Sequence, residues 1–183
     1  MIKNIFLFFL FSILFTAKCY SEQFRGIFGL KLYSSAEKYV EDGILTSNKF
    51  NNKETSKGYF DINVTDKINN KNPFLSKYWI VVDKSNMIKQ ISAEEKMISF
   101  NKCKNFKEEL LKIFKQKYGF SFENKNFTHK SFFSHKNYAK IENNSFLFLK
   151  CVDHFIDKSV NLIISYESKE FFNRKTEYYE SGF

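Results

Sequence analysis

The sequence predicts an α+β fold, in which an antiparallel sheet of roughly five to seven strands packs against one main helix and one or two short helices. Three observations support this prediction. Short apolar or alternating segments of strand length recur along the chain, as at residues 74–82 and 160–166. One longer segment, residues 104–118, repeats apolar residues at helical spacing. Polar turn residues separate the segments, as at residues 83–86.

The first 21 residues have the features of a cleavable export signal. Lys3 makes the start positive, residues 5–15 are apolar except for one serine, and small residues precede a cleavage site after Ser21. This apolar run of 11 residues is shorter than the roughly 20 that a membrane-spanning helix needs. We therefore expect a protein that is exported to a periplasmic or extracellular location.

Cleavage after Ser21 would leave residues 22–183, a length that suits one α+β domain. Several alternatives stay open at this point. The signal can be cut after Ala17 or Cys19 instead, it can remain as a short anchor, or Cys19 can carry a lipid.

The chain after the signal opens with a predicted strand over residues 24–32. Ser34 then has the position of a helix N-cap, and Glu37 three residues later completes a capping box for a short helix at residues 36–41. Apolar and polar residues alternate over residues 59–64, which predicts a second strand.

A hairpin is the next predicted unit, after a polar loop at residues 46–57. Residues 74–82 (FLSKYWIVV) form its first strand, residues 83–86 its turn and residues 87–92 its second strand.

Residues 104–118 predict the main helix. Its apolar positions recur every four residues, which places them on one face: Phe106, Leu110, Phe114 and Tyr118. Lys115 and Lys117 suit the negative end of the helix, and Gly119 ends it.

The last third of the chain is less regular. Residues 120–144 are polar and aromatic and have no clear assignment, whereas residues 145–152 and 160–166 predict two antiparallel strands. Residues 167–183 are expected to form a final helix or a docked tail.

Two cysteines remain after removal of the signal, Cys103 and Cys151. In an oxidising compartment two such residues predict one disulfide, which here would link the start of the main helix to a strand. Two buried free thiols are the alternative.

The chain is basic, with a formal net charge of +9, and removal of Lys3 and Lys18 with the signal lowers this to +7. The lysines are scattered and the only arginines are Arg25 and Arg174, so the charge does not indicate nucleic-acid binding. Aromatic residues make up 19% of the chain. We assign most of them to the core and to cross-strand pairs, with an exposed aromatic binding patch as the alternative.

No established catalytic motif occurs in the sequence. The glycines never cluster into a phosphate loop or a nucleophile elbow. Asp153, His154 and Asp157 form the one polar cluster with acid–base potential. Cys151 and His154 have a metal-like spacing, but no second pair of ligands follows the pattern, so we expect neither a metal nor another cofactor.

Three segments resemble small exported bacterial proteins that have a GLKLG-type opening and a Cys-helix-KYG segment. They are residues 26–37 (GIFGLKLYSSAE), residues 78–91 (YWIVVDKSNMIKQI) and residues 103–119, which end in Lys-Tyr-Gly. More remotely, the order of helix and hairpin is similar to outer-membrane assembly lipoproteins and β-lactamase-inhibitor-like domains. The resemblance implies a binding fold without an active site.

These observations together predict an exported, non-catalytic binding or envelope-associated protein. Its partner would be an envelope protein, a glycan or an anionic membrane surface, and not a nucleic acid. The alternatives are a peripheral binder of anionic membranes and a small hydrolase that uses His154 with Asp153 or Asp157.

Overall fold

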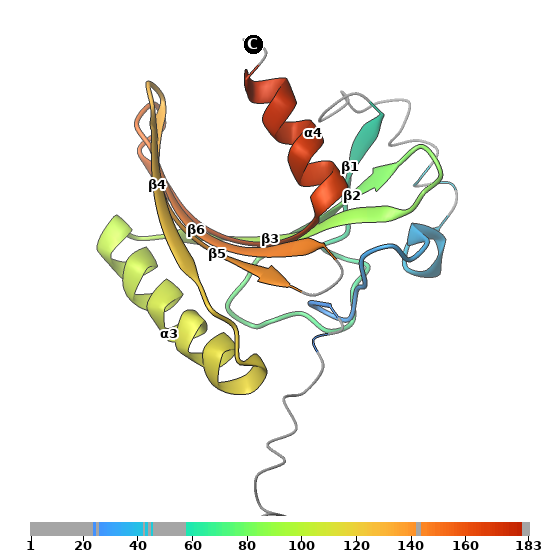
Figure 1. Ribbon diagram of the computed structural model, residues 1–183, viewed down its shortest axis with the longest axis horizontal. Coiled ribbons are helices and arrows are strands. Elements are labelled where there is room, and N and C mark those ends of the chain that lie inside the picture. The colour runs from blue at the N-terminus through green and yellow to red at the C-terminus, as the bar shows by residue number, and fades with distance from the viewer. Residues whose placement is uncertain are drawn as a thin grey trace, which may run out of the picture.

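The computed structural model describes residues 24, 26–41, 43, 45, 58–141 and 144–180. The predicted signal and the predicted loop at residues 46–57 lie outside the described residues. Within this part of the chain, seven strands form one antiparallel sheet with a long helix on one face and a shorter helix on the other (Figure 1). The predicted α+β fold is confirmed.

The sheet combines two meanders. Its strands are β1 (Tyr59–Asn63), β2 (Lys77–Asp83), β3 (Ile88–Met97), β4 (Glu123–His129), β5 (Phe132–Ile141), β6 (Ser145–His154) and β7 (Ser159–Ser168). Their order across the sheet is β1-β2-β3-β7-β6-β5-β4, with every neighbouring pair antiparallel. The pairing of β3 with β7 therefore joins the first meander to the second.

The helices lie on opposite faces. The sheet curves, with α3 (Phe100–Tyr118) outside the curve and α4 (Lys169–Glu180) inside it (Figure 1). We call the face against α3 the convex face and the opposite face the concave face. α3 packs on β6, β7 and β3, whereas α4 contacts β7 and β3.

The convex face carries the main core. Side chains alternate between the two faces of a strand, and the alternate residues that are buried on this side are mostly aliphatic. In the central strands they are Ile91, Ala93, Leu147, Leu149, Cys151, Val160, Leu162, Ile164 and Tyr166. Cys103 and Leu111 of α3 are buried against them. This side of the sheet thus holds its helix by apolar packing.

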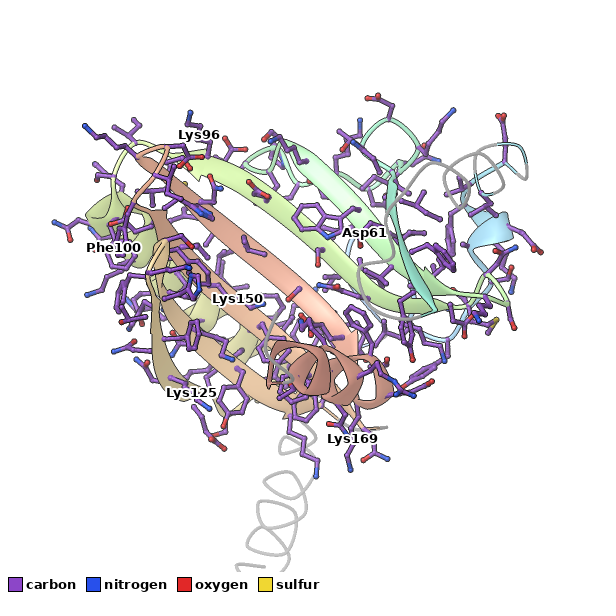
Figure 2. All side chains as sticks on the ribbon, turned by 90° about the horizontal axis from the view of Figure 1, so that it is seen from above. Asp61, Lys96, Phe100, Lys125, Lys150 and Lys169 are labelled. Carbon is purple, nitrogen blue, oxygen red and sulfur yellow. A yellow bond between two sulfur atoms is a disulfide. The ribbon has the colours of Figure 1, made fainter. Side chains whose placement is uncertain are left out.

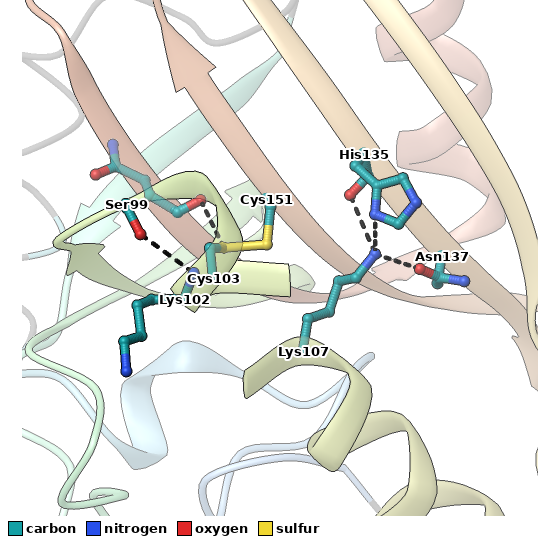
Figure 3. Close-up of a disulfide and its surroundings, with 8 residues drawn as sticks. Ser99, Lys102, Cys103, Lys107, His135, Asn137 and Cys151 are labelled. Carbon is teal, nitrogen blue, oxygen red and sulfur yellow. Dashed lines mark hydrogen bonds between the residues drawn. A yellow bond between two sulfur atoms is a disulfide. The ribbon is translucent and has the colours of Figure 1, made fainter. Parts of the chain in front are cut away.

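The predicted disulfide is present. Cys103 in the first turn of α3 is bonded to Cys151 of β6, with a Cα–Cα distance of 5.9 Å. Figure 3 shows this bond, and both residues are fully buried. Because the bond closes a loop of 48 residues in sequence separation, the chain-entropy estimate of its contribution is about 4 kcal/mol.

α3 begins four residues before its predicted start. The side chain of Ser99 accepts a hydrogen bond from the backbone N–H of Lys102 and caps the helix. The helix ends at Gly119, as predicted, with a φ of 70° at that glycine. The N-cap and not the apolar period sets the start, since residues 101 and 102 are exposed.

The predicted first strand at residues 24–32 is wrong. This segment turns at Phe28 and Gly29, which have φ values of 57° and 78°, and only Ile27 and Leu30 form an isolated bridge. At Gly26, a Cβ atom would lie 2.0 Å from the carbonyl oxygen of Leu30, so the turn requires glycine there.

The predicted capping box is also wrong. Ser35, and not Ser34, caps a 3-10 turn, η1 (Ala36–Lys38), by accepting a hydrogen bond from the N–H of Glu37. The Glu37 carboxylate instead accepts a hydrogen bond from the side chain of Asn86 in the β2–β3 turn. A tertiary contact has replaced the local one.

The other strand predictions are confirmed. The 59–64 strand, the hairpin and the final strand pair are confirmed as β1, β2–β3 and β6–β7, the later strands being longer than expected. The unassigned residues 120–144 contain β4 and β5. The final helix is α4, one of the two forms predicted for the tail.

Candidate functional site: the concave face

The concave face is polar where the convex face is aliphatic. Because Leu162 and Ile164 belong to the convex core, the alternate residues Ser165 and Glu167 of β7 point to the concave side. Register places Ser92 and Gln90 of β3 opposite them. All four side chains are buried, at 9% exposure or less. The centre of this face is therefore a layer of buried polar groups.

These groups satisfy one another. The Gln90 side-chain amide donates to Ser92 Oγ at 2.7 Å and to Glu167 Oε1 at 3.3 Å, and the Ser165 hydroxyl donates to the same carboxylate oxygen at 2.9 Å. Glu167 is thus held by neutral donors from two strands.

Two ammonium groups complete the surroundings of Glu167. Lys175 of α4 lies 2.7 Å from one carboxylate oxygen and Lys150 of β6 lies 3.7 Å from the other. Burial alone would raise the pKa of Glu167, but the charges of Lys175 and Lys150 outweigh it and hold the pKa at about 2. The carboxylate is therefore ionised inside the fold.

Lysines outnumber acids here. Lys125 of β4 is the register partner of Lys136 of β5, and Lys136 is the partner of Lys150. We call these three residues the lysine row. Directly opposed residues of neighbouring strands point to the same face, so the row crosses three strands on the concave side. Figure 2 looks onto this face and labels Lys125 at its rim and Lys150 farther in.

The pKa values of Lys150 and Lys136 in the lysine row are lowered, mainly by burial. Burial lowers the pKa of Lys150 to about 8, and the charges of Lys175 and Lys136 act in the same direction against the single carboxylate. Burial, followed by the charge of Lys125, likewise lowers the pKa of Lys136. The ion pairs thus hold Glu167 ionised, whereas at Lys150 burial outweighs the attraction of the shared carboxylate and leaves the pKa at about 8.

Aromatic rings lie against the ammonium groups of Lys136 and Lys150. The ring of Phe148 lies 5.2 Å from Lys136 Nζ and 5.0 Å from Lys150 Nζ. Phe148 also stacks against Phe172 of α4 at a centroid distance of 5.6 Å. Lys136 is also 5.8 Å from the ring of Tyr138. These contacts fix the two lysines at the border between β5, β6 and the helix.

α4 is anchored on the concave face by its first turn. Ser168 Oγ accepts from the N–H of Phe171, whose ring is buried against Tyr59 and Val81. Glu170 accepts hydrogen bonds from the Tyr59 hydroxyl and from Lys89, both at 2.9 Å. Burial and the bonded Glu170 raise the pKa of Tyr59 to about 12. This anchor directs the next turns of α4, and with them Lys175, toward Glu167.

The polar cluster of the sequence analysis lies at the end of β6 and in the turn after it. Asp153 and His154 are consecutive in β6, so their side chains point to opposite faces. His154 lies beside the ring of Phe132, at 6.0 Å between centroids. Asp157 Oδ1 accepts hydrogen bonds from the hydroxyl and the N–H of Ser159, which keep its pKa below the usual value. The contacts of these residues are those of a capped turn.

A fully buried lysine lies on the convex side, beside the disulfide. Lys107 of α3 is fully buried and donates to the side-chain oxygen of Asn137, and its Nζ lies 2.5 Å from His135 Nδ1 (Figure 3). Burial lowers the pKa of Lys107 to about 8. Burial and the Lys107 charge also lower the pKa of His135. Because the Lys107 side chain is not accessible to solvent, we regard its ammonium group as a structural element of the contact between α3 and β5.

Sequence reasoning missed Lys136, Lys150, Lys175 and Glu167. Two of the three strands of the lysine row lay in the unassigned segment, and the row exists only through strand register. The available signal was Lys150 as the one charged residue in a largely apolar strand (SFLFLKCV).

Within the described residues, no group of three His, Cys, Asp or Glu side chains is placed to hold a metal ion. No helix in that part of the chain combines the length and apolarity needed to cross a membrane. The disulfide between Cys103 and Cys151 points to an oxidising compartment outside the cytoplasm. Comparison with protein-family models, curated proteins and solved structures finds no match.

Proposed function

We propose that the protein is an exported, non-catalytic binding protein that holds an anionic group on the concave face of its sheet. One observation carries the proposal: the ammonium groups of Lys136, Lys150 and Lys175 gather around a single buried carboxylate, Glu167. The local charge is therefore positive by two when all four groups are ionised.

The arrangement is unfavourable without a ligand. Like charges that lie directly opposite on neighbouring strands destabilise a sheet, and the lysine row contains two such pairs. A bound phosphate, sulfate or carboxylate would offset this repulsion and would raise the pKa of Lys150 from about 8. The partly exposed side chains of Lys136, Lys150 and Lys175 leave the ammonium groups within reach of a ligand.

Export remains part of the proposal and rests on the N-terminal pattern together with the disulfide. Intact-mass measurement of the protein recovered outside the cytoplasm, with and without reductant, tests this part. We expect a chain that begins at Glu22 and gains two mass units on reduction. A full-length chain with reduced Cys103 and Cys151 in the cytosol would contradict it.

Anion binding is tested by thermal unfolding with sulfate, phosphate or citrate, against chloride at equal ionic strength. We expect the polyvalent anions to raise the melting temperature of the native protein. Lys150→Gln should weaken the affinity by about ten- to a hundredfold, since a hydrogen bond to a charged group contributes roughly 1.5–3 kcal/mol.

The matched control is Lys112→Gln, which removes the same charge from an exposed position on α3. It should leave the anion response unchanged. Equal responses of the Lys150 and Lys112 variants would show that the anion acts through the overall charge, and the concave face would lose its proposed role.

A further inference from the structure

Exposed apolar side chains gather at one end of the sheet, away from the lysine row. Ile98, Phe127, Phe155 and Ile156 are exposed at 97%, 52%, 48% and 83%. They lie where β3, β4 and β6 end and where β5 and β7 begin. We call this region, residues 96–98, 127–132 and 154–159, the turn end.

The segments of the turn end lie side by side. The backbone N–H of Phe155 donates to the carbonyl oxygen of Ser131 at 2.9 Å, which joins the β6–β7 turn to the β4–β5 turn. Phe127 is 5.8 Å from Phe132 between ring centroids. Met97 is the register partner of Val160, so Ile98 emerges beside the start of β7. Figure 1 shows the two hairpin turns adjacent to each other. The four apolar side chains thus come from the end of β4, the β3–α3 connection and the β6–β7 turn, all at one rim of the sheet.

Lysines surround these side chains. Lys96, Lys130 and Lys158 are exposed within the turn end, and Lys102 is exposed in the first turn of α3 (Figure 2 labels Lys96 at this end). The acid in the same turns, Asp157, is hydrogen-bonded to Ser159. The rim therefore combines protruding apolar groups with an excess of positive charge.

We propose that the turn end docks on an anionic lipid surface, with Ile98, Phe155 and Ile156 in the acyl boundary and the lysines on the lipid phosphates. This combination of apolar and basic groups is the one that holds peripheral proteins at anionic membranes. A second copy of the chain fits less well. Four side chains, two of them about half exposed, present a few hundred Å² of apolar surface, whereas a stable protein interface covers roughly 800 Å² per partner.

Vesicle cosedimentation tests the proposal with the protein recovered after export, its N-terminus identified by mass. The probes are phosphatidylcholine vesicles with and without phosphatidylglycerol. We expect binding to the anionic vesicles alone, and a decline as sodium chloride rises, because salt screens the attraction. Equal binding to both vesicle types, or none to either, would overturn the proposal.

The decisive variant is Phe155→Ser with Ile156→Ser, which should lower vesicle affinity by roughly tenfold or more, since two large side chains lose their burial. Ile113→Ser is the matched control, because Ile113 is 53% exposed on α3 and lies outside the turn end. It should change the affinity by less than about twofold. If residues 1–21 were retained, their contribution to vesicle binding would be the same in all variants. Equal losses in both variants would overturn the proposal.

Insertion has its own readout. Trp79 is the only tryptophan, so Phe155→Trp in a Trp79→Phe background places a single fluorophore at the turn end. Its emission should shift to shorter wavelength on anionic vesicles and be quenched by brominated lipid. Vesicle binding without a shift would mean attachment through another surface and would overturn the docking at the turn end.

Lys150→Gln then separates this inference from the proposed function. It should leave vesicle binding intact while weakening the response to soluble anions. Loss of vesicle binding in Lys150→Gln, with no loss in the Phe155/Ile156 variant, would move the lipid contact to the concave face and overturn the docking at the turn end.

Discussion

The two faces of the sheet hold their helices by different chemistry. α3 is attached to the convex face by apolar packing, by the Cys103–Cys151 bond and by the contact of the buried Lys107 with His135 and Asn137. α4 is attached to the concave face by Phe171 and by the ionic contacts of Glu170 and Lys175. Alternate residues of the same strands form the two faces. The convex face can therefore carry apolar side chains that stabilise the fold, while the concave face carries charged side chains.

Two lysines with lowered pKa values make the comparison sharper. Lys107 on the convex side and Lys150 on the concave side both have a pKa of about 8, in each case mainly through burial. Lys107 is surrounded by His135 and Asn137 under α3. Lys150 is 21% exposed and shares Glu167 with Lys175. Similar protonation therefore arises in a closed structural contact and in a partly open face, and only the second suits a ligand.

The largest effect should come from the convex face. Replacing both cysteines, Cys103→Ala with Cys151→Ala, removes the bond between α3 and β6 and should lower the free energy of unfolding by about 4 kcal/mol. Urea unfolding of the variant and of the oxidised and reduced wild type measures it. A loss below about 1 kcal/mol would mean that aliphatic packing alone holds the helix.

Acid should act on the concave face. The folded pKa of Glu167, about 2, is below its ordinary value of 4.5. Its contribution is therefore complete above about pH 5 and is lost as pH falls toward 2. The shift corresponds to about 3 kcal/mol of stability.

Glu167→Gln should be less stable at neutral pH and should lack most of this acid loss in urea unfolding between pH 5 and 2. Glu108→Gln on the exposed side of α3 is the control and should keep the wild-type profile. Identical acid profiles for the Glu167 variant and the wild type would mean that the ion pairs of Glu167 do not stabilise the concave face.

Alkali should have a smaller effect of the opposite sign. A lysine whose folded pKa is about 8 releases its proton in the folded protein before it does so in the unfolded chain, at 10.5. Stability should therefore rise between pH 8 and 10, by about 2 kcal/mol for Lys107. The pH range ends at 10 because tyrosines ionise above it. The raised pKa of Tyr59 would then lower the stability of the folded protein as pH rises.

Lys107→Met should reduce this rise by about 2 kcal/mol and leave the share of Lys150, whereas Lys112→Met, at an exposed position of the same helix, should leave the rise unchanged. Unfolding by urea at pH 8, 9 and 10 provides the comparison. An undiminished rise in Lys107→Met would assign all of it to Lys150 on the concave face.

Local patterns predicted the elements whose signals lie within a few residues. The apolar period of residues 106–118 marked α3, and two cysteines left by the predicted cleavage allowed a single pairing. The patterns failed where distant contacts decided the conformation. Glu37 contacts Asn86 instead of capping its own helix, and β4 has no buried residue to give it an alternating pattern.

The sequence by itself determined the α+β class, the main helix, the disulfide partners and the expectation of export, because these follow from periodicity, composition and count. The tertiary structure alone decided which side chains meet. Register aligns Lys125, Lys136 and Lys150 across three strands, and the pairing of β3 with β7 sets Gln90 beside Glu167, 77 positions away. Strand register depends on the whole sheet, and a shift of one residue would turn these charges to the opposite face, which is why no local pattern could reveal them.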